Sequence, residues 1–146
     1  MRLGKARLVP EFYVTDFQRS VAFYTEILGF SVAYDRPEER FAYLERDGAE
    51  LMIEQTVDPT RMFNIGALEP PLGRGMSLQI EVGDVDRLYT AVCAAGAPMV
   101  RAMEERWYRG GAIEMGHRQF WVQDPDGYVL RFFQDLGQRP AKEPAR

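Results

Sequence analysis

The chain has 146 residues, enough for one hydrophobic core and too few for two ordinary domains. A formal net charge of −4 at pH 7 argues against a nucleic-acid-binding protein, which usually needs a basic face. No apolar run is long enough to span a membrane, no secretory leader pattern opens the chain, and the single cysteine, Cys93, excludes an internal disulfide framework. We therefore expect a cytoplasmic protein that binds neither nucleic acid nor membrane.

The first predicted helix lies in VTDFQRSVAFYTEILGF, residues 14–30, after an alternating strand. Asp16, or Thr15 with Gln18 three residues later, supplies the oxygen that caps the exposed amides at the helix start. Apolar side chains recur at helical spacing behind this cap, and Gly29 ends the helix. Two strand-like runs follow it, FAYLERD and ELMIEQ.

The pattern of the first helix recurs 68 residues later, in VGDVDRLYTAVCAAGAP at residues 82–98. Asp84 caps this second predicted helix, and Gly96 ends it. Three strand-like runs come after it: MVRAM, which is the weakest, then RQFWVQ and YVLRFF. The repeat therefore predicts two strand–helix–strand–strand–strand modules.

We predict a single α+β domain that consists of two tandem βαβββ modules. The first module covers residues 5–65 and the second covers residues 76–136. Residues 66–75, rich in proline and glycine, form the linker between them. Residues 137–146 have no apolar pattern, and we expect this tail to be disordered.

Alternation along the predicted strands gives each sheet two different faces. Leu78, Ile80 and Val82 point to one side, which we expect the helix to cover, whereas Gln79 and Glu81 point to the other. The strands of the first module alternate in the same way. The second face is either exposed to solvent, as in most antiparallel sheets, or the wall of a cleft between two strongly curved sheets.

The stretch from Val14 to Phe30 has the pattern V-x-D-x-x-x-S-x-x-F-Y-x-x-x-L-G-F, which resembles the opening of the glyoxalase/bleomycin-resistance/extradiol-dioxygenase (vicinal oxygen chelate) superfamily. DPDGYVLRFF, residues 124–133, is similar to the closing hairpin of that superfamily. Together with the repeat, the resemblance covers about residues 6–136. It implies curved sheets around a cup-shaped cavity and a homodimer, in which modules are sometimes exchanged between chains. Closure of the cavity by one chain or by two is left open.

Enzymes of this superfamily hold a divalent metal with His and Glu side chains on the cavity face. The resemblance puts the four ligand positions at Val9, Glu54, Ser77 and Arg131, of which only Glu54 is a suitable ligand. A catalytic zinc site usually has about three protein ligands, and dioxygenase iron needs two His and a carboxylate. The single histidine, His117, is outside these positions. We therefore expect no metal, no other cofactor and no catalytic residue.

The bleomycin-resistance branch of the superfamily also lacks a metal, and GHRQFWVQDPDG, residues 116–127, resembles the segment before its last hairpin. The resemblance implies a protein that sequesters an antibiotic without chemistry. A planar or cationic ligand needs aromatic rings for stacking and carboxylates for its charge. EERWYRGG, residues 104–111, is the predicted binding loop, because two adjacent aromatic residues among charges and glycines are poorly explained by core packing. The predicted ligand-binding residues are Trp107, Tyr108, Glu11, Glu54, Gln79, Glu81, Arg131 and Tyr43.

Two other functions remain open. One is a metal-dependent lyase or dioxygenase of the same superfamily with an atypical ligand set, Glu11, Glu54 and Gln79. The other is a non-catalytic interaction module whose cavity is filled by its own aromatic side chains. Within a binding protein, Arg131 with Arg118 would favour an anion or a carboxylate-bearing metabolite in place of a cation.

Overall fold

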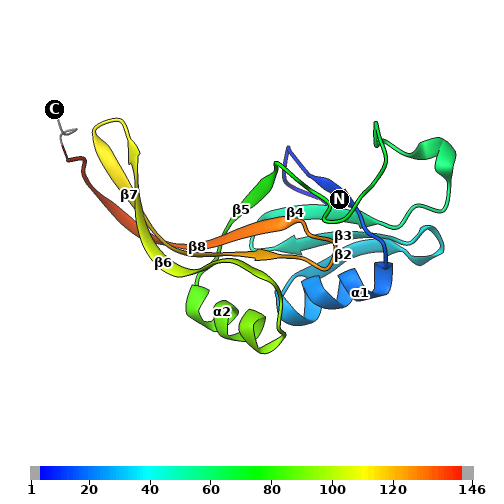
Figure 1. Cartoon of the computed structure of the whole chain (residues 1–146), viewed down its shortest axis with the longest axis horizontal. Coiled ribbons are helices and arrows are strands. Elements are labelled where there is room, and N and C mark those ends of the chain that lie inside the picture. Colours follow the sequence, from blue (N-terminus) through cyan, green and yellow to red (C-terminus); the bar gives the residue numbers. More distant parts are fainter. Residues whose placement is uncertain (1–3, 143–146) are drawn as a thin grey trace. The chain divides into compact units, whose positions relative to one another are not determined.

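The computed structural model describes residues 4–142, and its elements repeat the order βαβββ twice along the chain (Figure 1). The chain divides into two compact units. The first unit runs to Met76 and includes the turn Asp124–Tyr128; the second unit holds Ser77–Gln123 and the residues from Val129 onwards. The predicted α+β class and the two tandem βαβββ modules are confirmed.

The first unit contains a mixed four-stranded sheet in the order β1-β4-β3-β2, in which β1 is parallel to β4 and the other neighbours are antiparallel. Its elements are β1 (Glu11–Tyr13), α1 (Phe17–Ala22), a π-helical turn (Phe23–Ile27), β2 (Ser31–Arg36), a 3-10 turn (Pro37–Glu39), β3 (Phe41–Arg46), β4 (Ala49–Glu54) and a 3-10 turn (Pro59–Arg61). The sequence patterns did not locate β2. Its side chains are largely exposed, and a register shift between Val32 and Tyr34 interrupts its alternation.

The helical segment of the first unit begins and ends where the sequence predicts. The carboxylate of Asp16 accepts a hydrogen bond from the backbone amide three residues later at 3.1 Å. Gly29, in the left-handed region at φ 77°, follows the last turn. Between these ends, α-helical bonding stops at Ala22 and Phe23–Ile27 wind as a π-helix, so the internal winding differs from a single α-helix.

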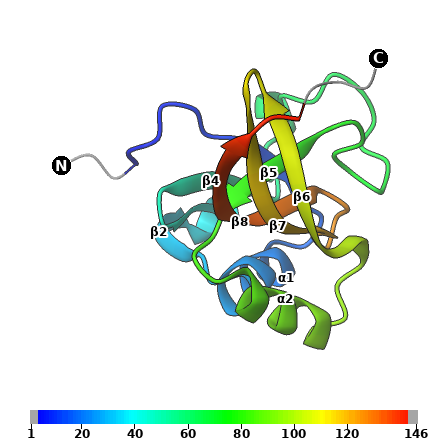
Figure 2. The ribbon, with the colours of Figure 1, turned by 90° about the vertical axis from the view of Figure 1, so that its left-hand side faces the viewer.

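The second unit contains a four-stranded sheet in the order β5-β8-β7-β6, with β5 parallel to β8. Its elements are β5 (Ser77–Glu81), α2 (Val85–Ala94), β6 (Met99–Gly110), β7 (Ile113–Gln123) and β8 (Val129–Pro140). The carboxylate of Asp84 caps α2 at 3.0 Å, as predicted. The three long strands β6 to β8 are bent along their length (Figures 1 and 2). Neither α2 nor any other described helix is long and apolar enough to cross a membrane.

Burial in the second unit follows the predicted alternation. Ile80 and Val82 are buried and Leu78 is half-buried, whereas Gln79 and Glu81, which alternate with them, are exposed. The fully buried residues of the neighbouring strands are Phe120, Val122, Leu130 and Phe132. The core of this unit therefore lies between α2 and one face of the sheet, and the polar residues occupy the other face.

Residues 104–111, predicted to be a binding loop, are instead almost entirely part of β6. Trp107 pairs with Gly116 across the β6–β7 hairpin, and Tyr108 is a strand residue beside it. Backbone hydrogen bonds between strands need no apolar alternation, so the charged and glycine-rich sequence extends the strand up to a short turn. The two aromatic residues are therefore fixed on a sheet and not presented on a loop.

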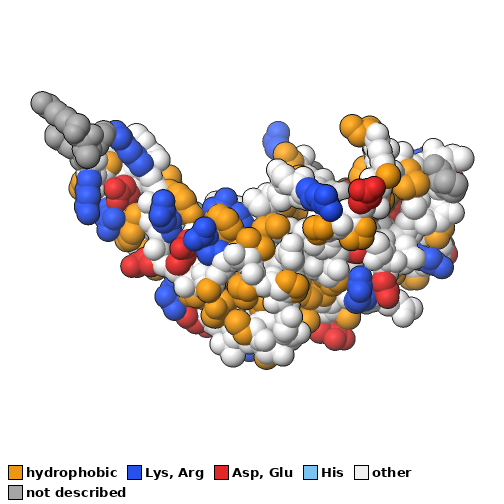
Figure 3. All heavy atoms as spheres, viewed as in Figure 1, with side chains coloured by type: hydrophobic (Ala, Val, Ile, Leu, Met, Phe, Trp, Pro, Cys, Tyr) orange, Lys and Arg blue, Asp and Glu red, His pale blue; other side chains and the backbone are white. Residues whose placement is uncertain are grey.

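The prediction that residues 137–146 are disordered is wrong for the first residues of this segment. Strand β8 continues to Pro140 and stays paired with β7, with Arg139 opposite Glu114. These two side chains form an ion pair at 2.7 Å, and the Arg139 guanidinium lies 4.1 Å from the centre of the Trp107 ring. Figure 3 shows basic and acidic side chains close together at this end of the strands, at the left of the view. Backbone hydrogen bonds and ion pairs order residues 137–140, and the hydropathy of the sequence does not reveal either interaction. Residues 143–146 lie outside the described residues.

The turn Asp124–Tyr128 packs as a core element of the first unit. One carboxylate oxygen of Asp124 accepts two backbone amides of the turn at 2.9 Å, and the other accepts the Tyr24 hydroxyl at 2.9 Å. The Tyr128 ring stacks on Phe12 with centroids 4.3 Å apart, and its hydroxyl donates to a carbonyl of β1 at 2.8 Å. Burial raises the pKa of Asp124 to about 6. The turn therefore holds buried groups of the first unit together.

Gly127 tests how closely this turn is packed. Its φ is 96°, and a Cβ there would collide with Pro71 and crowd the backbone nitrogen of Leu72. Gly48 has a similar φ of 90° but open space around the position of a Cβ. We expect Gly48→Ala to lower the free energy of unfolding by about 1–2 kcal/mol through backbone strain alone. Gly127→Ala should cost about 1–3 kcal/mol more through overpacking, measured by urea denaturation. Equal losses in the two variants would contradict a packed turn.

Candidate functional site

The first unit contains a cavity of about 700 Å³ on the sheet face that alternates with its buried core. This volume is within the usual range of small-molecule pockets. Each strand of the sheet contributes to the walls, and the segment after β4 contributes one side. The residues used below are Glu11 on β1, Tyr34 and Arg36 on β2, Phe41 on β3, Glu54 at the end of β4, and Phe63 beyond the sheet.

Two carboxyl groups, those of Glu11 and Glu54, meet in this cavity. Burial, followed by the hydrogen bond to Glu54 and the charge of Glu54, raises the pKa of Glu11 to about 7. The charge of Arg36 acts in the opposite direction, but the Arg36 Nε also donates to Glu39 at 2.6 Å. The pair therefore retains one proton up to near-neutral pH and gains a second negative charge above it.

Aromatic rings surround the two carboxyl groups. The rings of Tyr34 and Phe41 are 6.0 Å apart, and the Arg36 guanidinium lies 4.0 Å from the centre of the Phe41 ring. Phe63 stacks on Tyr13 at 3.9 Å, and 52% of its side chain remains exposed. The Phe63 amide donates to the Tyr13 hydroxyl at 2.7 Å, which fixes this part of the wall. The cavity therefore offers flat apolar surface beside negative charge.

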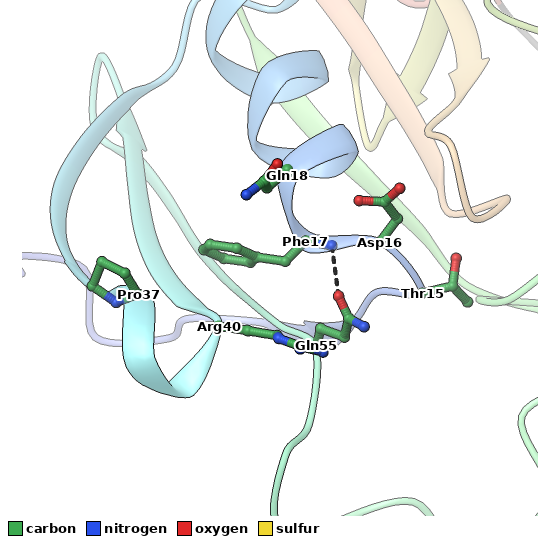
Figure 4. A pocket seen from close by; sticks show the side chains of 7 residues that line it. All are labelled: Thr15, Asp16, Phe17, Gln18, Pro37, Arg40 and Gln55. Carbon is green, nitrogen blue, oxygen red and sulfur yellow. Dashed lines mark hydrogen bonds between the residues drawn. The ribbon is translucent and has the colours of Figure 1, made fainter.

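A second cavity of the first unit, about 500 Å³, lies at the start of α1 (Figure 4). The Phe17 amide, which a ligand at a helix start would use, already donates to the Gln55 side chain at 2.9 Å. The neighbouring Asp16 carboxylate caps the same helix. None of the predicted ligand-binding residues lines this cavity. We therefore assign the ligand site to the larger cavity.

The second unit carries a polar network on the face of β6, β7 and β8 that alternates with its buried core. The guanidinium of Arg131 lies 4.3 Å from the centre of the Trp121 ring, and its Nη2 donates to the Tyr108 hydroxyl at 3.4 Å. Gln119, 1% exposed, donates to that hydroxyl at 2.7 Å and to Glu104 at 2.9 Å. Gln119 was not among the predicted ligand-binding residues, although its spacing of two from Trp121 indicates the same face.

His117 belongs to the same strand face but not to a cluster of metal donors. Its ring stacks on Phe133 with centroids 4.0 Å apart, and its Nδ1 is buried without a hydrogen-bond partner among the described residues. Burial and the charge of Arg131 lower the pKa of His117, while the charge of Asp135 opposes them. The imidazole is therefore neutral at physiological pH.

The predicted residues of the first unit are partly brought together. Glu11 and Glu54 line the larger cavity. Tyr43 is 6% exposed and stacks 5.0 Å from Tyr34, but it does not line that cavity. Tyr34 and Arg36 do line it, and sequence reasoning missed both because strand β2 was not located.

The predicted residues of the second unit separate into three groups. Tyr108 and Arg131 belong to the polar network. Trp107 packs against Gly116, where a Cβ would collide with its indole, and stacks with Arg139. Gln79 and Glu81 are exposed on β5. Of the atypical metal set, Glu11 and Glu54 lie in the first unit, whereas Gln79 lies in the second.

The positions at which the family resemblance implies metal ligands do not fit a metal site. Val9 and Glu54 are in the first unit, and Ser77 and Arg131 are in the second. A valine side chain cannot bind a metal, a serine hydroxyl is a weak ligand, and a guanidinium repels a cation. Among residues 4–142 no group of three or more His, Cys, Asp and Glu side chains could hold a metal ion.

The sequence and the fold of this chain are similar to those of several known proteins. A sequence profile of the Glyoxalase/Bleomycin resistance protein/Dioxygenase superfamily matches residues 7–132. The chain is 29% identical over 131 residues to a probable lactoylglutathione lyase of Vibrio parahaemolyticus serotype O3:K6, covering 84% of this chain and 85% of that protein. It is 30% identical to a lactoylglutathione lyase of Arabidopsis thaliana, covering 90% of this chain but 44% of the plant protein, so it spans less than half of that relative. The crystal structure of TioX from Micromonospora sp. ML1 is similar, with a TM-score of 0.69, 25% identity, and coverage of 90% of this chain and 100% of that one.

The raised pKa of Glu11 predicts a specific dependence of stability on pH. Glu11 binds its proton up to about pH 7 when folded and only up to about 4.5 when unfolded, so stability falls as pH rises between these values. Glu11→Gln removes this ionisation and should flatten the fall, making the variant more stable than the wild type at pH 8. Chemical denaturation from pH 4 to 8 measures the effect. Glu26→Gln makes the same charge change at an exposed site and should leave the slope unaltered; a wild-type slope in Glu11→Gln would contradict the raised pKa.

Proposed function

This chain belongs to the Glyoxalase/Bleomycin resistance protein/Dioxygenase superfamily, and on that premise we propose that it binds a small molecule and sequesters it without a metal. Proteins with the same fold can have different functions, so the function is inferred from the residues of the site. The supporting observation is the first-unit cavity of about 700 Å³, in which Glu11 and Glu54 lie among aromatic rings. The poor fit of Val9, Ser77 and Arg131 to metal binding supports the same function.

The ligand that suits this cavity is planar and cationic. The exposed face of Phe63 favours stacking with a planar group, whereas Phe41, 4% exposed and covered by the Arg36 guanidinium, belongs to the wall behind it. The paired carboxyl groups of Glu11 and Glu54 favour a positive charge, because a cation compensates both the burial and the repulsion between the two groups that raise the pKa of Glu11. An antibiotic of the bleomycin type has this chemistry, and bleomycin is therefore the first probe. We further propose that the protein is a homodimer, which the family resemblance supports, and that it acts in the cytoplasm, which suits a chain with a single cysteine.

Binding of bleomycin and of a panel of planar cationic compounds tests this function. We expect saturable binding by isothermal titration calorimetry to at least one of them. Affinity should increase from pH 6 to pH 8, because Glu11 loses its proton over that range and the cavity becomes more negative. Glu54→Gln at pH 8 should weaken binding about 10-fold or more through the loss of a charge-assisted contact. Phe63→Ala should weaken binding about 10-fold through lost stacking and apolar contact.

Glu26→Gln is the matched control, because it removes one carboxylate from an exposed position away from the cavity lining. Its affinity should equal that of the wild type at both pH values. Absence of saturable binding to every compound in the panel would overturn the proposed function. An equal loss of affinity in Glu26→Gln and Glu54→Gln would show that overall charge, and not the cavity, governs binding.

A lactoylglutathione lyase is the second candidate, favoured by the names of the relatives from Vibrio parahaemolyticus and Arabidopsis thaliana. Superfamily enzymes need a divalent metal, and the residues at the expected ligand positions do not fit one, as Arg131 illustrates. Metal analysis of protein purified without chelators distinguishes the candidates. We expect substoichiometric zinc, nickel and iron, and no formation of S-lactoylglutathione. Stoichiometric metal together with that activity would replace sequestration by catalysis.

A further inference from the structure

Arg131 has no ion-pair partner among the described residues, in contrast to Arg118, the other half-buried arginine of the second unit. Arg118 and Arg131 are the two half-buried arginines among the described residues of the second unit. Arg118 forms an ion pair with Asp86 at 2.6 Å. No described carboxylate forms an ion pair with Arg131. Arg131 is half-buried, its Nε atom is buried, and it has no countercharge within residues 4–142, so the side chain remains available to an anionic partner.

The guanidinium of Arg131 is held in a fixed orientation. Its central carbon lies 4.3 Å from the centre of the Trp121 ring, and Trp121 is the direct neighbour of Arg131 across β7 and β8. The hydroxyl of Tyr108 holds Nη2, and buried Gln119 fixes that hydroxyl at 2.7 Å. A long, flexible side chain loses much conformational freedom on binding, and this packing removes that freedom in advance.

Two buried N–H groups, which lack hydrogen-bond partners within the described part of the chain, suggest that this face binds an acceptor. The Nε of Arg131 and the Nε1 of Trp121 are both buried, and neither has a hydrogen-bond partner among the described residues. Buried polar groups are almost always paired, so each of these donors carries the cost of lost water. The neighbouring residue on β5, Gln79, is exposed. Of the nearby acids, Glu104 is occupied by Arg101 and Gln119, and Glu81 is exposed on β5.

We propose that this face of β7 and β8 is an oxyanion site, in which Arg131 and Trp121 bind a carboxylate or phosphate group of a small molecule. The Nε–H and an Nη–H of Arg131 form a planar fork that matches two oxygens of such a group. The Nε1–H of Trp121 supplies a further donor from the adjacent strand. The site lies wholly in the second unit and involves negative charge, so it does not depend on the cationic ligand of the first-unit cavity.

Indole N–H signals in ¹⁵N-labelled full-length protein test the site directly. The chain has two tryptophans, and Trp121→Phe assigns their signals. Titration with benzoate, and separately with inorganic phosphate, should shift the Trp121 indole N–H saturably downfield in the wild type. The Trp107 signal serves as the internal control, since that ring packs on Gly116 and Arg139. Tighter binding of one probe identifies the source of the oxyanion.

Variants of the arginine complete the test. Arg131→Gln should weaken the better probe at least 10-fold, and Arg131→Lys, which retains the charge without the fork, should give an intermediate loss. Arg118→Gln removes the same charge from an arginine of the second unit that already has an ion-pair partner, and it should leave the affinity unaltered. Shifts of both indole signals in parallel, or no saturable shift of Trp121 with either probe, would overturn the site. The titration of the wild-type protein is sufficient to support or overturn the site, so the test remains valid even if a variant folds poorly.

Discussion

The period-two alternation of the strands is the constraint on which the rest of the structure depends. Apolar residues such as Ile80 and Phe132 are buried on one face of a sheet, so the residues between them are committed to the other face. A shift of register by one residue would exchange the two sets, at the cost of the whole core. Glu11, Glu54 and Arg131 are therefore functional candidates because of their position in a pattern, although they are far apart in the sequence.

Sequence reasoning was strongest where a local signal and burial coincide. The capping residues Asp16 and Asp84, together with apolar alternation, correctly indicated both modules. It was weakest where order comes from long-range pairing without burial. Strand β2 and the outer halves of β6 and β8 have mostly exposed or charged side chains, so their hydropathy resembles that of loops. Tyr34 and Arg36 were lost from the predicted site for this reason, and Gln119 was lost because a buried amide resembles a surface one in sequence.

The sheets of the two units carry opposite chemistry. The first unit gathers the carboxyl groups of Glu11 and Glu54 in a cavity, whereas the second unit presents donors around Arg131. The two modules thus share one backbone plan, while their second faces differ in charge. At the position where the family resemblance implies a metal ligand, this chain has Arg131, and a guanidinium favours an anion over a cation. A single side chain can therefore decide which charge of ligand a backbone position suits.

The core of the first unit depends on the turn Asp124–Tyr128, which comes late in the chain. This turn completes the core of the first unit, although the strands that deliver it, β7 and β8, belong to the second. A fragment that ends at Met76 would lack the acceptor of the Tyr24 hydroxyl and the ring stacked on Phe12. The early part of the chain consequently has to wait for the last hairpin before its core is complete. During synthesis on the ribosome, the first module would remain exposed to chaperones and proteases until residues 124–128 have emerged.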